Sequence, residues 1–457
     1  MKRNPRVLPR ALRVLSLVCA AHALLAANVA QAQIAPYYLD ASQAVTYDSN
    51  LFRVSTAERS DVISTTALTV GIDQPISRQR LLAHATGRYN LYRDNDQLNA
   101  PGYDIGAGIN WEAASRLSGH ARVNFSQSQA AFENYGALQQ VQSGKNLERV
   151  SVLDLRGQYG GQSLLSVEAL ANLTHVRYSS SQFAGRELRS RMLGVGMGYR
   201  PSNDWVLGIR LRRTNGEYGG GIADEYDRDD IDFTARYQAS GFSSISGRLS
   251  HTKEDHDLDT ARNFSGVTGE VRWDYQATGK LGLGVRAARE TGSGASIGGL
   301  TNAATSAGAG AGIGSGTGTG TGTSSDSPAP PLAGTAGGPL TASSGPGYLT
   351  DSQLSNRFGL QARFDATAKI RLNATVNYSR DRYDTRFVTG GAGTGGTTSR
   401  GNTRQWLLGA DYLATRVWNF GCGVGREDRS TLLVLAGNTP YAYDVTTAYC
   451  NARLSLR

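Results

Sequence analysis

The segment LLAHATGRYNL at residues 81–91 decides the fold of this 457-residue chain, because apolar and polar side chains alternate along it. Its apolar face consists of Leu81, Ala83, Ala85, Gly87, Tyr89 and Leu91, and its mostly polar face of Leu82, His84, Thr86, Arg88 and Asn90. Successive side chains of a β-strand point to opposite faces. The segment therefore predicts a strand with one apolar and one polar face, about as long as a tilted strand that crosses a bilayer.

The same alternation recurs along the chain from Tyr38 onward. It is clear at residues 103–112 and 117–126, and helical periodicity is not sustained. Further segments lie near Ala44 and Val62, and others begin near Val150, Leu165, Leu188, Trp205, Asp230, Phe242, Ser265, Lys280, Asp351, Ile370, Arg404, Val417 and Tyr443. Together these segments predict about 18 strands. An even count is typical of a single-chain bacterial barrel, so we expect one transmembrane antiparallel β-barrel in an all-β fold.

The connections between these segments alternate in length. Tight turns, such as those at residues 113–116 and 201–204, follow long loops, such as residues 128–147 and 216–227. Short periplasmic turns and long extracellular loops are typical of outer-membrane barrels. We therefore expect both chain ends in the periplasm. Residues 292–347 consist almost entirely of Gly, Thr, Ala, Ser and Pro, which predicts a disordered, flexible extracellular loop, and residues 388–401 are a shorter version of it.

The first residues have the pattern of an export signal. A basic start is followed by an apolar run from Val14 to Ala27 and by the small-x-small pattern at residues 30–32. We expect a cleaved signal peptide at residues 1–32, a barrel at residues 33–457, and location in the outer membrane of a Gram-negative bacterium. Five of the positive charges in the net charge of +9 lie in this leader, which leaves +4. This excess of positive charge is small and spread along the chain, which argues against a nucleic-acid partner.

The polar face of the predicted strands is rich in arginine. The candidates for lining a pore are Arg88, Arg122, Arg156, Arg210, Arg212, Arg236, Arg248, Arg272, Arg286, Arg357 and Arg363. Acidic residues are interleaved with them in nearly equal number. Arginine binds carboxylates in two-point geometry, so these residues could form a pathway for an anionic or hydroxyl-rich polymer. Alternatively, they form ion pairs across strands that stiffen the wall. A polar lumen follows from either interpretation.

The sequence shows few arrangements of residues that are typical of a catalytic site. We expect neither an enzyme nor a bound cofactor. The six histidines have no recognised metal-ligand spacing. Residues 224–230 and 251–257 contain enough carboxylates and histidines to hold a divalent cation, but such runs are more often solvated charges of loops. Glycine-rich strings such as residues 194–198 lie within predicted strands and lack the context of a nucleotide loop.

Cys422 and Cys450 are the two cysteines of the expected mature chain, and alternation places both on the outward face of the last two strands. Directly opposed residues of an antiparallel pair are close enough for a disulfide, and the periplasm is oxidising. The pattern favours a disulfide that fastens the final hairpin. The alternative is two small apolar residues that face lipid.

Residues 45–53, VTYDSNLFR, resemble the start of the exopolysaccharide-biosynthesis outer-membrane proteins of EpsL type, within the wider porin-like barrel families. The residues that carry the resemblance are Asp48, Asn50, Leu51, Phe52 and Arg53. Beyond them, the likeness is the general hairpin pattern as far as Cys422 and Cys450. The loop at 292–347 is an addition to the family pattern, and the chain ends on Leu456 and Arg457 where barrels commonly end on an aromatic residue.

The resemblance implies a polar pore that serves export or surface assembly of an extracellular polysaccharide. The implied partners are outer-membrane lipid, the polysaccharide and other components of its export. Two alternatives stay open from the residues alone. One is a general diffusion porin for small solutes, and the other is a non-conducting surface or scaffold barrel whose loops bind a partner.

Overall fold

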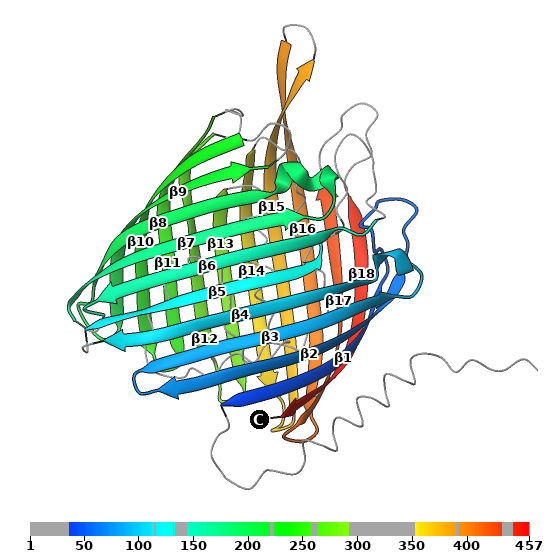
Figure 1. Ribbon diagram of the computed structural model, residues 1–457, viewed down its shortest axis with the longest axis horizontal. Coiled ribbons are helices and arrows are strands. Elements are labelled where there is room, and N and C mark those ends of the chain that lie inside the picture. Colours follow the sequence, from blue (N-terminus) through cyan, green and yellow to red (C-terminus); the bar gives the residue numbers. More distant parts are fainter. Residues whose placement is uncertain are drawn as a thin grey trace, which may run out of the picture. The chain divides into compact units, whose positions relative to one another are not determined.

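The computed structural model describes residues 36–113, 116–130, 132, 144–161, 163–219, 224–257, 263–291, 352–389, 393–431 and 442–456. Residues 37–456 form one unit, a closed antiparallel barrel of 18 strands (Figure 1). The predicted signal peptide and the loop at 292–347 lie outside the described residues, so both stay predictions. In the part of the chain that is described, no helix is long and apolar enough to span a membrane.

The strands follow one another in chain order. The first nine are β1 (Tyr37–Asp48), β2 (Asp61–Ile76), β3 (Gln79–Tyr92), β4 (Ala100–Ala113), β5 (Leu117–Gln129), β6 (Leu147–Tyr159), β7 (Leu165–Tyr178), β8 (Leu188–Tyr199) and β9 (Trp205–Tyr218). The others are β10 (Asp224–Ser240), β11 (Ser243–His256), β12 (Phe264–Gln276), β13 (Leu281–Thr291), β14 (Ser352–Asp365), β15 (Ile370–Thr389), β16 (Gly393–Leu413), β17 (Trp418–Thr431) and β18 (Tyr443–Leu456). The loops contain two short 3₁₀ helices, η1 (Asp96–Leu98) and η3 (Ser181–Arg186).

Each strand pairs with its sequence neighbours, and the first strand pairs with the last. The pairing of β1 with β18 runs from Leu39 opposite Leu456 to Asp48 opposite Thr447. The ring of hydrogen bonds is therefore closed, which removes the exposed edges that an open sheet would have. The structure confirms the predicted 18-stranded barrel.

The two ends of the barrel differ in the length of their connections. At one end, which we call the short-turn end, neighbouring strands join through two to five residues. Ser77 and Arg78, for example, join β2 to β3. Gly160, after β6, has φ of +77°, a backbone conformation that suits glycine. The other end, which we call the long-loop end, holds most of the long connections, including residues 49–60 and 130–146.

The strands near the long-loop end extend further than the sequence indicates. The expected loop at 388–401 is mostly strand, because β15 runs to Thr389 and β16 begins at Gly393. The expected loop at 216–227 shrinks to residues 219–223. Backbone hydrogen bonds across the hairpin do not require an apolar side chain, and Gly and Thr residues of the β15–β16 hairpin therefore stay in the ladder.

The outer face of the barrel is apolar and exposed, so the molecule has no single central core. On β8, for example, Leu193, Val195 and Met197 are between half and two-thirds exposed. Some of the buried apolar residues instead form two small clusters near the long-loop end. One consists of Leu51, Phe52, Val54, Ile63, Tyr92, Leu98 and Phe132, and the other of Val176, Leu188 and Tyr218. An exposed apolar belt of this kind is what lipid would cover.

Candidate functional site

The face of the strands opposite the apolar belt carries most of the polar side chains, and we call it the inner wall. Strand β9 shows the division clearly. Leu207, Ile209 and Leu211 are exposed on the outer face, whereas Arg210 and Arg212 between them are only 5% and 8% exposed. The two arginines are buried because acidic side chains from neighbouring strands cover them.

Glu168 on β7 joins two arginines of the inner wall. Arg156 Nη2 lies 2.5 Å from Glu168 Oε2, and Arg210 Nε donates to Glu168 Oε1 at 2.8 Å. Gly196 on β8 lies between Glu168 and Arg210 in the register. A Cβ atom at Gly196 would stand 2.9 Å from Glu168 Oε1. The glycine-rich string at 194–198 thus leaves room for an ion pair that spans three strands. This packing role accounts for the glycines, and a nucleotide-binding loop is not needed to explain them.

Two fully buried carboxylates on β10 form a second cluster. Arg212 Nε contacts Asp232 Oδ2 at 2.6 Å, and Arg228 Nε contacts Asp230 Oδ2 at 3.0 Å. Hydroxyl groups of β11 complete their hydrogen bonds: Ser250 donates to Asp232 and Thr252 to Asp230. Buried charges are tolerated where they are paired and hydrogen-bonded, as these are.

Four more of the predicted arginines also have acidic partners. The pairs are Arg248 with Glu290 at 3.6 Å, Arg272 with Asp274 at 2.7 Å, Arg286 with Glu270 at 2.8 Å, and Arg363 with Asp365 at 3.1 Å. Arg286 and Glu270 join the adjacent strands β13 and β12, and Arg248 and Glu290 connect β11 to β13, so these two pairs can stiffen the wall. The other two pairs lie within single strands. For these residues the geometry favours the ion-pair interpretation over a set of free anion ligands.

Arg88 and Arg122 differ from the paired arginines. The Nε atom of each is buried and has no hydrogen-bond partner among the described residues. Arg122 Nη2 donates to Asn110 at 3.3 Å, and Arg88 lies against Gly102, where a Cβ atom would meet its side chain at 2.8 Å. Among the described residues, no ion pair joins either of these two guanidinium groups to a carboxylate, so their positive charge is not neutralised by direct contact.

The last two predicted arginines, Arg236 and Arg357, also occupy inner-wall positions. Arg357 Nε donates to the buried Ser355 hydroxyl at 3.0 Å. Arg236 stands opposite Val206 on β9 and Ser246 on β11.

Three histidines of the inner wall pair with carboxylates, which the sequence analysis did not identify. His84 Nε2 lies 2.5 Å from Asp104 Oδ1, and His120 Nε2 lies 2.6 Å from Asp154 Oδ1. His256 contacts both Asp224 at 2.8 Å and Glu254 at 3.1 Å. The inward position of each histidine could be read from the alternation. Its partner could not, because the partner depends on the register between strands.

The two acidic runs considered for a cation lie on strands rather than in loops. Residues 224–230 belong to β10 and residues 251–256 to β11. Their inward carboxylates, including Asp230 and Glu254, contact Arg228. Among the described residues, no group of three or more His, Cys, Asp and Glu side chains is arranged to hold a metal ion.

The polar residues of the string at 48–53 are buried and hold the loop after β1 in place. Asn50 donates to the carbonyl oxygens of Val54 and Asp444, and Val54 N–H donates to the Asn50 side chain. Arg53 Nη1 lies 2.9 Å from Asp48. The contact with Asp444 extends the pairing of β1 and β18, so these residues secure the seam where the barrel closes.

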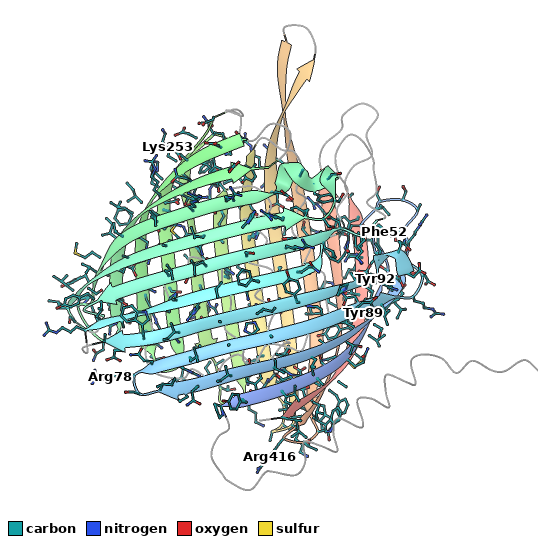
Figure 2. The ribbon with its side chains drawn as sticks, in the orientation of Figure 1. Phe52, Arg78, Tyr89, Tyr92, Lys253 and Arg416 are labelled. Atoms are coloured by element: carbon teal, nitrogen blue, oxygen red, sulfur yellow. A yellow bond between two sulfur atoms is a disulfide. The ribbon has the colours of Figure 1, made fainter. Side chains whose placement is uncertain are left out.

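The apolar residues of the same string anchor the first buried cluster. Leu51 and Phe52 are almost fully buried, and the Phe52 ring packs edge-on against Phe132 with centroids 5.2 Å apart. Figure 2 shows Phe52 and Tyr92 near each other, far from Arg78 in the short connection between β2 and β3. The string is therefore a folding element of the long-loop end.

Cys422 and Cys450 lie opposite each other in the register of β17 and β18 and form a disulfide. Their Cα atoms are 4.1 Å apart, and both residues face outward with Phe420 and Val424. The bridge links the last hairpin on its apolar side.

A model of the family described as "Putative beta-barrel porin 2" matches residues 38–191. The search of curated proteins gave no match. Solved structures with a similar fold include OpdK of Pseudomonas aeruginosa, with 10% identity, a TM-score of 0.45, and coverage of 92% of this chain and 99% of that chain. OccAB3 of Acinetobacter baumannii has 9% identity, a TM-score of 0.44, and the same coverage. The ferric-catecholate import receptor Fiu of E. coli has 8% identity and a TM-score of 0.43, and the match covers 92% of this chain and 81% of Fiu.

Proposed function

We propose that this protein is an outer-membrane channel through which small hydrophilic solutes diffuse. The observation that carries the proposal is the division of the closed barrel into an apolar, exposed outer face and an inner wall of polar and charged side chains. A barrel of about 16 to 18 strands is wide enough for an aqueous channel. The match to a porin family model over residues 38–191 supports the same function.

The pairing of charges on the inner wall favours a channel of low selectivity. Most of its predicted arginines contact a carboxylate, as Arg212 contacts Asp232, and so offer little net field to a passing ion. Arg88 and Arg122 are the exceptions described above. The inner wall is therefore hydrophilic and nearly neutral. We expect the channel to be slightly more permeable to anions than to cations.

Passage of an extracellular polysaccharide is the second candidate. The observation that favours it is the resemblance of residues 48–53 to the exopolysaccharide proteins of EpsL type. Those side chains are buried in the first loop, however, where they close the barrel rather than meet a polymer. The string thus supports a loop structure in common with the EpsL-type proteins more directly than a common transported molecule. We therefore prefer general diffusion of small solutes as the function.

Conductance of the purified protein in planar lipid bilayers tests the proposal. We expect stepwise openings with a conductance that rises in proportion to salt concentration, and an ion selectivity close to neutral. Acidic polysaccharide added to one side should leave the current unchanged for a diffusion channel. Block of the current by the polymer would favour the second candidate. Folded protein that inserts without conducting would contradict both and identify a scaffold barrel.

A further inference from the structure

The outer face carries a basic patch near the long-loop end of β6, β7 and β8. It consists of Arg149, His175, Arg177, Arg189 and Arg191, and we call it the outer basic patch. The residues between them on the same strands, such as Val176 and Leu188, are buried on the inner side. The four arginines of the patch are exposed. These side chains therefore point away from the lumen.

The strand register brings like charges together in this patch. Arg149 on β6 stands directly opposite Arg177 on β7, so two positive charges face each other across these strands. The uncharged His175 stands opposite Arg189 on β8. Like charges that face each other across two strands destabilise a sheet. A negatively charged group outside the chain that binds both side chains would relieve this repulsion.

Acidic groups of the chain do little to neutralise the patch. The nearest ion pair is that of Arg189 with Glu217, at 3.8 Å and well exposed. Arg149 Nε donates to Gln127 at 2.8 Å and Arg177 Nε to His175 at 2.9 Å, and both acceptors are uncharged. Arg191 contacts no acidic group among the described residues.

Three other outward cations near the long-loop end have acidic partners. Arg213 contacts Asp227 at 2.9 Å, Lys253 contacts Asp255 at 2.7 Å, and Arg426 contacts Asp444 at 3.1 Å. These three positions differ from Arg149, Arg177 and Arg191 because each has an acidic partner.

The patch borders the apolar belt directly. Along β8 the outward residues are Tyr199, Met197, Val195 and Leu193, and Arg191 follows at once. Leu173 on β7 stands opposite Arg191 and ends the apolar row of its own strand. The guanidinium groups therefore lie where acyl chains would end and lipid headgroups begin.

We propose that the outer basic patch binds the phosphate groups of an anionic lipid of the leaflet at the long-loop end. Phosphate oxygens accept paired hydrogen bonds from arginine, and the neighbouring apolar belt receives the acyl chains. With the long loops outside the cell, this lipid is the phosphorylated glycolipid of the outer leaflet. The inference uses the membrane location in the proposed function but not conduction, so a barrel that fails to conduct would leave it intact.

Lipid retention by the purified full-length protein tests this site. Protein in uncharged detergent is mixed with diphosphorylated lipid A, and bound lipid is measured by native mass spectrometry. The variant Arg149→Gln/Arg177→Gln/Arg191→Gln should bind the lipid about ten- to a hundredfold more weakly than the unmodified protein. The matched control Arg213→Gln/Lys253→Gln/Arg426→Gln removes the same charge from paired positions and should bind normally. The shift of folded barrel in unheated gel electrophoresis shows that each variant is folded.

Three outcomes would overturn the assignment. Equal retention by the patch variant and the unmodified protein would show that the patch is not the site. An equal loss in the control variant would show a general effect of net charge. Complete displacement of the lipid by inorganic phosphate at equal concentration would identify a site for free phosphate. Binding that falls with added salt and with removal of a lipid phosphate is expected from the proposal.

Discussion

At the scale of single residues, the string at 48–53 shows how a sequence signature can serve folding. Burial lowers the pKa of the Arg53 guanidinium, but the nearby Asp48 and Glu427 outweigh this effect and raise it overall. Arg53 therefore stays charged at every pH at which the protein would be studied. Its charge and that of Asp48 are both nearly inaccessible to water, so each depends on the other.

The variant Arg53→Gln should destabilise the barrel, because it leaves the Asp48 carboxylate buried without its partner. The expected loss is about 3 to 5 kcal/mol of unfolding free energy. Arg59→Gln is a matched control, since Arg59 is exposed in the same loop. Urea titration of both variants in lipid vesicles, followed by tryptophan fluorescence, measures the difference. Equal stability of the two variants would mean that the pair does not hold the seam.

Arg88 and Arg122 offer a second prediction at this scale. Their charge lacks a contacting carboxylate, so Arg88→Gln/Arg122→Gln should lower the anion-to-cation permeability ratio of the channel about twofold. Arg289, which faces outward on β13 and donates to the Val267 carbonyl at 3.1 Å, provides the control Arg289→Gln. Reversal potentials in a salt gradient measure both. A shift in the control as large as that in the double variant would exclude a lumen effect.

At the scale of elements, the final hairpin is held by the bridge between Cys422 and Cys450, which closes a loop with a sequence separation of 28. Such a loop restricts the unfolded chain, so Cys422→Ser/Cys450→Ser should lower the unfolding free energy by about 3 to 4 kcal/mol. Urea titration with and without prior reduction of the unmodified protein gives the comparison. Reduced protein and the double variant should agree, and a double variant as stable as the oxidised protein would contradict the prediction.

The number of strands and the two faces of each could be predicted because period-two alternation is a local property of the sequence. The sequence predicts too short a β15–β16 hairpin, because its Gly and Thr residues show no alternation of apolar and polar side chains. Their backbone groups still pair across the two strands. The contacts between side chains of the inner wall could not be predicted from the sequence, for a different reason. Glu168 meets Arg210 only because β8 places Gly196 between them, and that depends on the register of three strands.

At the scale of the whole molecule, the lengths of the connections predict the direction of the barrel in the membrane. The alternation of short and long connections predicts that the long-loop end faces the outside and that the predicted loop at 292–347 is extracellular. Lys145, in the connection before β6, and Arg78, in the turn before β3, lie at opposite ends and suit a paired test. Both side chains are exposed, so cysteine at either position should react readily with thiol reagents.

We expect a maleimide that cannot cross membranes to label Lys145→Cys in intact cells and to label Arg78→Cys only after the outer membrane is permeabilised. Cys422 and Cys450 do not interfere, since they are joined in the disulfide, and Cys19 lies in the predicted signal peptide. Protease added to intact cells should also cleave within residues 292–347 before any other site. Labelling of Arg78→Cys in intact cells, with Lys145→Cys protected, would reverse the orientation. It would place the outer basic patch in the inner leaflet, where the expected lipid is a phospholipid.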